Sequence, residues 1–94
     1  MNIDEPVEFL WDLGNINKNL NKHNVTNEEI EQAFWDDNKK SLADILHSGT
    51  EERQILLGKT FAKRILFIVF TIRKGKIRVI SARDLNNKEL NLYN

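Results

Sequence analysis

The sequence predicts an α+β domain in which helices pack on one face of an antiparallel β-sheet. Two apolar, β-branched and aromatic runs, Ile65–Ile72 and Ile77–Ala82, flank a short polar turn. Gly75 in that turn can take the positive φ of a tight loop, so the two runs predict a hairpin. A capping box from Thr26 to Glu29 precedes apolar residues at helical spacing and marks a helix. These features indicate separate helical and sheet layers.

The N-terminal segment predicts a short strand followed by a weak helix. Val7–Trp11 is interpreted as the strand. Asp12 is a good N-cap for a helix over Leu13–His23. We expect this helix to end near Asn24, because asparagine tolerates the left-handed conformation.

The apolar residues of this first helix predict which of its sides is buried. Ile16 and Leu20 lie four apart, so they are expected to share one helical face against the core. Asn15, Asn19 and Lys22 are expected to point elsewhere.

The second helix begins at the Thr26 capping box. Ile30, Ala33 and Phe34 form its predicted buried stripe, and the polar run 36–38 ends it.

Four later segments are interpreted as strands of the sheet: Lys39–Leu46, Glu51–Gly58, Ile65–Ile72 and Ile77–Ala82. Ile65–Ile72 is apolar on both faces, which predicts a central strand covered on both sides. A second cap, Asn86 to Glu89, predicts a short terminal helix. The expected order is a strand, two helices, three or four antiparallel strands and a final helix.

Composition limits the class of protein. The 94 residues are expected to form one domain, 1–94, and the chain has no cysteine, which excludes disulfides and thiolate chemistry. No apolar run approaches the length of a membrane span, and the acidic N-terminus is unlike a signal peptide, so we expect a cytoplasmic protein. Two histidines without cysteine give no zinc-ligand spacing, and there is no Gly-rich phosphate loop. We therefore expect no metal and no cofactor.

The charged residues divide the chain into two halves of opposite sign. Residues 1–52 hold four lysines and twelve acids, a net charge of −8, whereas residues 53–94 hold ten Lys or Arg and two acids, a net charge of +8. Such asymmetry suggests a polyanion partner for the basic half. The formal net charge of zero fits a small local phosphate site better than purely electrostatic nucleic-acid binding.

A resemblance is carried by residues spread over nearly the whole chain. In order they are Trp11-Asp12, Asn19, Lys22-His23, Val25-Thr26, His47-Ser48, Glu51-x-Arg53, Gly58, Thr71-x-Arg73, Arg78-x-Ile80-Ser81-Ala82-Arg83, Glu89 and Tyr93. They resemble the BrnT family of toxins from type II toxin–antitoxin systems. The segment 78–83 is the most specific part of the resemblance.

The resemblance implies a RelE-like fold and a metal-independent endoribonuclease that cleaves RNA and stops growth. It also implies a ribbon-helix-helix antitoxin, bound in a heterotetramer that contacts operator DNA through the antitoxin. Two departures from the family pattern, Asn15 in place of a Lys and Leu90 in place of an Arg, remove basic residues. They keep open the alternative of a non-catalytic antitoxin-binding or RNA-binding module of the same fold.

Cleaving RNA without a metal uses the 2′-hydroxyl as nucleophile, and it needs a base, an acid and cations that stabilise charge on the phosphorus centre. Histidine suits proton transfer near neutrality, a carboxylate can act as base, and arginine matches phosphate bidentately. We therefore assign catalysis to His47, Glu51, Arg53, Arg78 and Arg83. Arg78 and Arg83 are five apart, so they share a strand face only if the strand ends or bulges near Ser81.

RNA binding is assigned to Lys22, His23, Arg73 and Tyr93. Three of these four residues have a structural alternative. His23 can complement a helix dipole, Arg73 can protect a sheet edge, and Tyr93 can pack in the core. Glu51 and Arg53 share a strand face, so a plain ion pair competes with their catalytic role.

Overall fold

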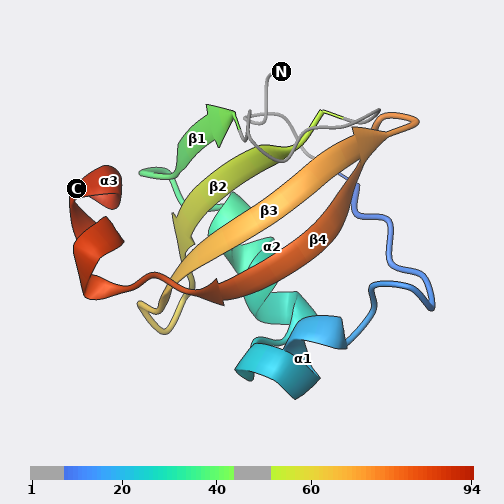
Figure 1. Cartoon of the computed structure of the whole chain (residues 1–94), viewed down its shortest axis with the longest axis horizontal. Helices are drawn as coiled ribbons and strands as arrows, with labels where there is room; N and C mark the ends of the chain where they lie inside the picture. Colours follow the sequence, from blue (N-terminus) through green and yellow to red (C-terminus); the bar gives the residue numbers. More distant parts are fainter. Residues whose placement is uncertain (1–7, 44–51) are drawn as a thin grey trace.

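The computed structural model describes residues 8–43 and 52–94. It confirms the α+β class and the antiparallel sheet, whose strand order is β1-β2-β3-β4 (Figure 1). The strands are β1 (Lys40–Ala43), β2 (Gln54–Lys59), β3 (Ile65–Arg73) and β4 (Lys76–Asp84). The helices are α1 (Lys18–His23), α2 (Asn27–Phe34), the 3-10 turn η1 (Asn87–Glu89) and α3 (Leu90–Tyr93). None of the helices in the described ranges is long and apolar enough to cross a bilayer.

The predicted hairpin joins β3 to β4, and β3 is a central strand as expected. Lys74 and Gly75 both have positive φ, 54° and 77°, between the paired residues Arg73 and Lys76. Positive φ at both central residues is the geometry of a type I′ turn, which matches the twist of antiparallel strands.

The core lies between α2 and one face of the sheet (Figure 1). The predicted stripe of α2, Ile30, Ala33 and Phe34, is buried there, and the Thr26 capping box is present. Gly58 of β2 allows this packing, because a Cβ at that position would lie 2.3 Å from the carbonyl oxygen of Ala33. The main core residues are Val25, Ile30, Ala33, Phe34, Leu56, Leu66, Ile68, Phe70, Ile77, Val79 and Ala82.

The expectation that β3 is covered on both faces is wrong for the described residues. Leu66 and Ile68 are fully buried toward α2, whereas Phe67 and Val69 on the other face are only half-buried. The helix α2 covers one face of the sheet. On the second face, apolar side chains of β3 line a hollow that is described below. We call this second face the open face.

The first helix is shorter than predicted. It begins at Lys18 after the left-handed Asn17, and Asp12 is not its N-cap. Asp12 closes an earlier turn, in which its carbonyl oxygen accepts from the N–H of Ile16 at 2.8 Å. The expected end is confirmed, because Asn24 is left-handed, with φ 56°.

The predicted burial of this segment is inverted. Asn15 and Asn19 are 3% exposed, while Ile16 and Leu20 are 41% and 40% exposed. The side-chain oxygen of Asn19 accepts from the N–H of Ala82 at 2.9 Å, and the side-chain amide of Asn15 donates to the carbonyl of Val79 at 3.3 Å. β4 is an edge strand, and its outward backbone groups need hydrogen-bond partners, which these amides supply.

The predicted strand Val7–Trp11 reduces to one parallel bridge, Phe9 to Ile77, within its described residues. Ile77 accepts from the N–H of Leu10 and donates to the carbonyl of Glu8, both at 2.8 Å. This segment continues the cover of the β4 edge.

Other strand bounds also differ from expectation. β1 spans Lys40–Ala43, and the rest of the predicted strand, 44–46, lies outside the described residues. β2 starts at Gln54, three residues later than predicted. The terminal cap is confirmed, because the side chain of Asn86 accepts from the N–H of Glu89.

Candidate functional site

A hollow of about 350 Å³ lies on the open face, on the opposite side of the sheet from α2. Its floor is largely apolar, and arginines stand at its margins. The lining residues are Arg53, Ile55, Phe67, Val69, Ile80, Ser81 and Arg83.

A β-bulge in β4 places Arg78 and Arg83 on the same face of the sheet. The pairing passes from Val69–Ser81 to Phe70–Val79, so Ile80 is an extra residue in β4. Beyond the bulge, Arg83 pairs with Phe67, and before it Arg78 pairs with Thr71; these β3 partners are four apart and therefore share a face. The expectation that Arg78 and Arg83 share a face only if the strand bulges near Ser81 is therefore met.

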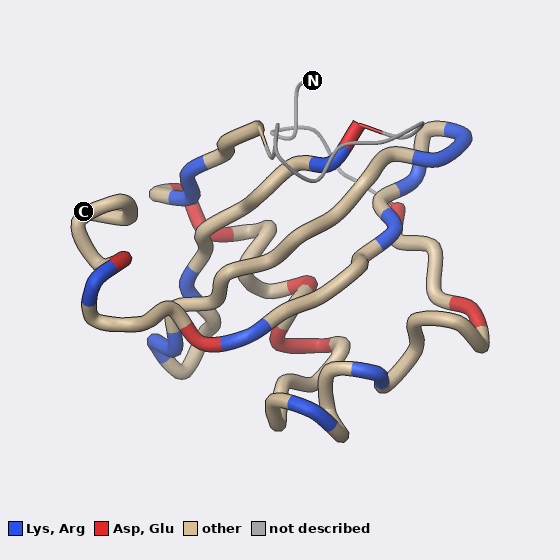
Figure 2. Tube along the Cα trace, in the orientation of Figure 1, with Lys and Arg blue, Asp and Glu red and all other residues tan. Residues whose placement is uncertain are grey.

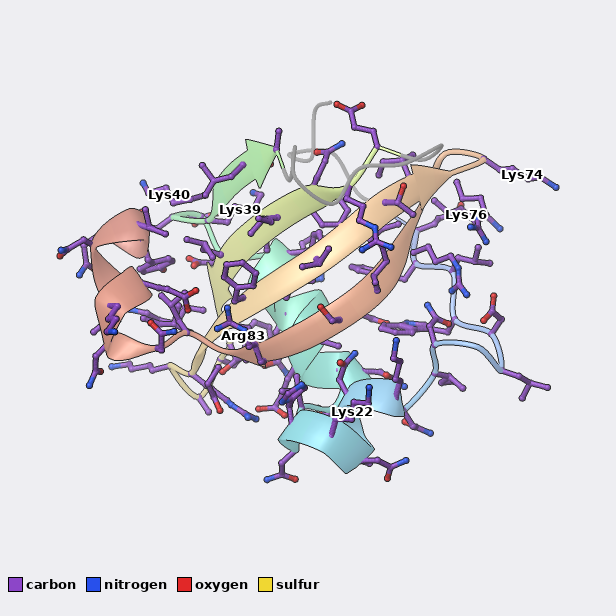
Figure 3. The ribbon with its side chains drawn as sticks, viewed as in Figure 1. Lys22, Lys39, Lys40, Lys74, Lys76 and Arg83 are labelled. Carbon is purple, nitrogen blue, oxygen red and sulfur yellow. The ribbon has the colours of Figure 1, made fainter. Side chains whose placement is uncertain are left out.

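Arg83 is held from two directions at the end of β4 (Figure 3). Its Nη1 and Nη2 donate to Oε1 and Oε2 of Glu89 at 2.8 and 2.9 Å, and Nη1 also donates to the carbonyl of Asp84 at 3.0 Å. Its Cζ lies over the ring of Phe67, 4.2 Å from the centroid. The paired guanidinium lowers the pKa of Glu89 to about 2, so this carboxylate is ionised at neutral pH.

Arg78 is held more loosely. Its Nη2 lies 3.5 Å from Oδ1 of Asp12, and its side chain is 20% exposed. Its Nη1 is buried and has no hydrogen-bond partner among the described residues. Arg78 lies on the same face as Arg83 but does not line the hollow.

Of the five residues assigned to catalysis, Arg53 and Arg83 border the hollow together. They reach it from different parts of the sheet, since Arg53 directly precedes β2 and Arg83 is the next-to-last residue of β4. His47 and Glu51 lie outside the described residues.

The four residues assigned to RNA binding do not gather at the hollow. Lys22 and His23 are exposed on α1, which lies beside β4 (Figure 3). Arg73 lies at the hairpin end of β3, six residues and roughly 20 Å along the strand from Phe67. Tyr93 is 6% exposed, and its hydroxyl donates to Asp36, which together with burial raises the pKa of Tyr93 to about 12.

The charge division of the sequence is partly neutralised in the fold, because Glu8, Asp12 and Glu29 pair with Lys76, Arg78 and Arg64. Acidic residues of α2 lie behind the sheet, whereas Lys and Arg stand at both ends of the β3–β4 hairpin (Figure 2). In the ranges 8–43 and 52–94, no group of three or more His, Cys, Asp or Glu could hold a metal ion.

The family model described as the ribonuclease toxin BrnT of type II toxin–antitoxin systems matches residues 11–89. This chain belongs to the BrnT family. The resemblance drawn from the sequence is confirmed, and membership makes the chain a toxin of a ribonuclease class, with RNA as substrate and an antitoxin protein as partner. No curated protein matches the chain.

Sequence reasoning missed the part that Phe67 and Glu89 play in the site of this BrnT toxin. The sequence pattern places Phe67 in an apolar strand and predicts Glu89 as a helix cap, without connecting either residue to Arg83. Glu89 is such a cap, but it also forms an ion pair with Arg83. Two signals in the sequence connect Glu89 with Arg83: it follows six residues later, and both belong to the residues that carry the family resemblance.

Proposed function

We propose that this BrnT toxin is a metal-independent endoribonuclease that binds RNA across the open face of its sheet. The observation that supports this most is the bulge at Ile80, which gives Arg78 and Arg83 of the most specific family segment a common face. Arg53 borders the hollow on that same face. Arg53 and Arg78 suit a substrate whose reacting group is a phosphate, and Arg83 lies beside them with its charge balanced by Glu89.

The proposed reaction is an in-line attack of the RNA 2′-oxygen on the adjacent phosphorus. A base removes the 2′-hydroxyl proton, the new bond from the 2′-oxygen to phosphorus forms, and the bond from phosphorus to the 5′-oxygen breaks. An acid protonates the departing 5′-oxygen, leaving a 2′,3′-cyclic phosphate and a 5′-hydroxyl. We assign proton transfer to His47 and Glu51, and each such role is typically worth about 10²–10⁴-fold in rate.

Charge stabilisation is assigned to Arg53 and Arg78. Arg78 suits this role because Asp12, its carboxylate neighbour in the described ranges, lies 3.5 Å from Nη2, so the charge of Arg78 is balanced less closely than that of Arg83. Arg83 differs, since Glu89 balances its charge at short distance.

The direct test is incubation of the purified, antitoxin-free protein with single-stranded RNA in excess chelator, followed by analysis of the product ends. We expect cleavage with cyclic phosphate and 5′-hydroxyl termini. Loss of cleavage in chelator, or 5′-phosphate products, would overturn the mechanism. If the protein binds RNA and leaves it intact, the non-catalytic module replaces the enzyme.

For control of the toxin, we propose a ribbon-helix-helix antitoxin in a heterotetramer that binds operator DNA through the antitoxin. The net charge of +8 on residues 53–94 supports an acidic antitoxin segment that competes with RNA for the same surface. Lys22, His23 and Arg73 remain proposed RNA contacts. Tyr93 is buried and its hydroxyl is bonded to Asp36, which favours its alternative role in packing. A single domain over residues 1–94 and action in the cytoplasm, where the RNA is, complete the proposal. Titrating the antitoxin into a complex of toxin and labelled RNA should release the RNA, and a stable ternary complex would contradict direct competition.

A further inference from the structure

We propose that Arg83 is a stacking platform for one unpaired RNA base, and that the hollow beside it is the subsite for that base. The inference rests on the proposed function, because it requires RNA to lie on the open face. It replaces the phosphate-binding role that the sequence assigned to Arg83.

The charge around Arg83 disfavours a phosphate. The carboxylate of Glu89 takes one N–H from each Nη group of Arg83, at 2.8 and 2.9 Å, and it is ionised because the pKa of Glu89 is about 2. A phosphate at this guanidinium would gain little net attraction and would meet the carboxylate as a like charge. A neutral base does not meet this repulsion.

The guanidinium of Arg83 is held in a fixed position. Phe67 lies under its Cζ at 4.2 Å, and the Glu89 pair and the Asp84 carbonyl hold its Nη groups. The side chain is nevertheless 37% exposed and borders the hollow. An arginine held in this way can offer its planar surface to a nucleobase, which is a common mode of recognising unpaired RNA.

The lining of the hollow suits a nucleobase. Ile55, Val69 and Ile80 contribute apolar side chains to its lining, and Ser81 contributes a hydroxyl. Its volume of about 350 Å³ lies at the lower end of the range for small-molecule sites. An apolar hollow with a planar cation at its margin fits the face and edge of a base better than a hydrated phosphate.

The experiment compares binding of two oligomers that carry the same number of phosphates. One is a 2′-O-methyl RNA of about ten nucleotides, prepared separately with A, C or U throughout. The other is an abasic oligomer of the same length. The 2′-O-methyl group blocks the nucleophile, so binding is measured apart from cleavage. For the best-bound base, we expect the parent to prefer the base-containing oligomer about 5- to 150-fold, the range for one stacked base.

Three variants remove the platform in different ways. Arg83→Lys keeps the charge and loses the plane, Phe67→Leu keeps apolar volume and loses the ring, and Arg83→Gln with Glu89→Gln removes both charges together. All three should lower the base preference toward one and leave binding of the abasic oligomer near the parental value. Lys74→Asn, in the distant hairpin turn, is the control and should retain the base preference.

The outcomes separate base stacking from phosphate binding. If Arg83 instead holds a phosphate, the double variant should bind the abasic oligomer more weakly, and the slope of log affinity against log salt should become shallower by about 0.7. That result, or a parent without base preference, would overturn the inference. A base preference that depends on Arg83 in a protein that cleaves no RNA would leave the inference standing and the proposed catalysis refuted. If the Arg83 variants do not fold, Phe67→Leu tests the stacking platform alone: a parental base preference in this variant would overturn the inference.

Discussion

Arg83 and Glu89 form a bidentate ion pair, with Nη1–Oε1 and Nη2–Oε2 distances of 2.8 and 2.9 Å. Glu89 also accepts from the N–H of Asn86 at 3.0 Å, so the same carboxylate closes the cap of the C-terminal helical segment. One side chain therefore fixes an arginine at the hollow and anchors the end of the chain. This dual role links the stability of the C-terminus to the shape of the proposed site.

The ion pair predicts a pH-dependent contribution to stability. Arg83 lowers the pKa of Glu89 from 4.5 to about 2, so the stabilisation is complete above pH 4.5 and is lost as the pH falls toward 2. Glu89→Gln should lower the melting temperature at pH 7, and the difference from the parent should shrink between pH 4.5 and 2. Thermal unfolding followed by circular dichroism checks this, and a difference that stays constant over that interval would contradict it.

Gly58→Ala should destabilise the fold. The added Cβ would lie 2.3 Å from the carbonyl oxygen of Ala33, a backbone atom that can yield only if α2 moves away from β2. We expect a cost of about 1–3 kcal/mol or more in the free energy of unfolding, measured in urea. Gly14→Ala is the matched control, since its nearest atoms are side-chain ends of Arg78 and Asp12 at 3.1 and 3.2 Å. Equal stability of the two variants would argue against the close approach of α2.

The buried amide of Asn19 predicts a contrast between two asparagines of α1. Asn19→Ala removes the acceptor for the N–H of Ala82 and leaves a buried donor unpaired, which typically costs about 1–3 kcal/mol. Asn21→Ala, at an exposed position of the same helix, should not destabilise the protein, because alanine favours helix. Denaturant unfolding of both variants tests whether Asn19 is buried against β4. A larger loss in the free energy of unfolding for Asn21→Ala than for Asn19→Ala would refute this burial.

The features predictable from the sequence were those set by local chemistry. The hairpin follows from two β-branched runs around Gly75, and the two caps follow from the spacing of Thr26 to Glu29 and of Asn86 to Glu89. A side-chain oxygen and a backbone N–H three residues apart form a cap whatever the rest of the fold does.

The features that could not be predicted depend on contacts between segments that are distant in the sequence. Helical periodicity predicts that Ile16 and Leu20 are buried. Asn15 and Asn19 are buried instead, because their side-chain amides bond to the backbone of the edge strand β4. The common face of Arg78 and Arg83 depends on one extra residue, Ile80, which no local pattern marks. The pairing of Arg83 with Glu89 similarly requires knowledge of how the chain turns after β4.

The central claim is that the free protein cleaves RNA on the open face without a divalent metal. The most direct measurement is the cleavage rate of single-stranded RNA in excess chelator for the parent, Arg78→Ala and the turn variant Lys74→Asn, with the thermal stability of each. We predict that the parent and Lys74→Asn release cyclic-phosphate ends at similar rates, and that Arg78→Ala lowers kcat/KM by about 10²–10³-fold while remaining folded, the typical loss for one donor to transition-state charge. A parent that cleaves only with added metal, or a folded Arg78→Ala that cleaves as fast as the parent, would contradict the account.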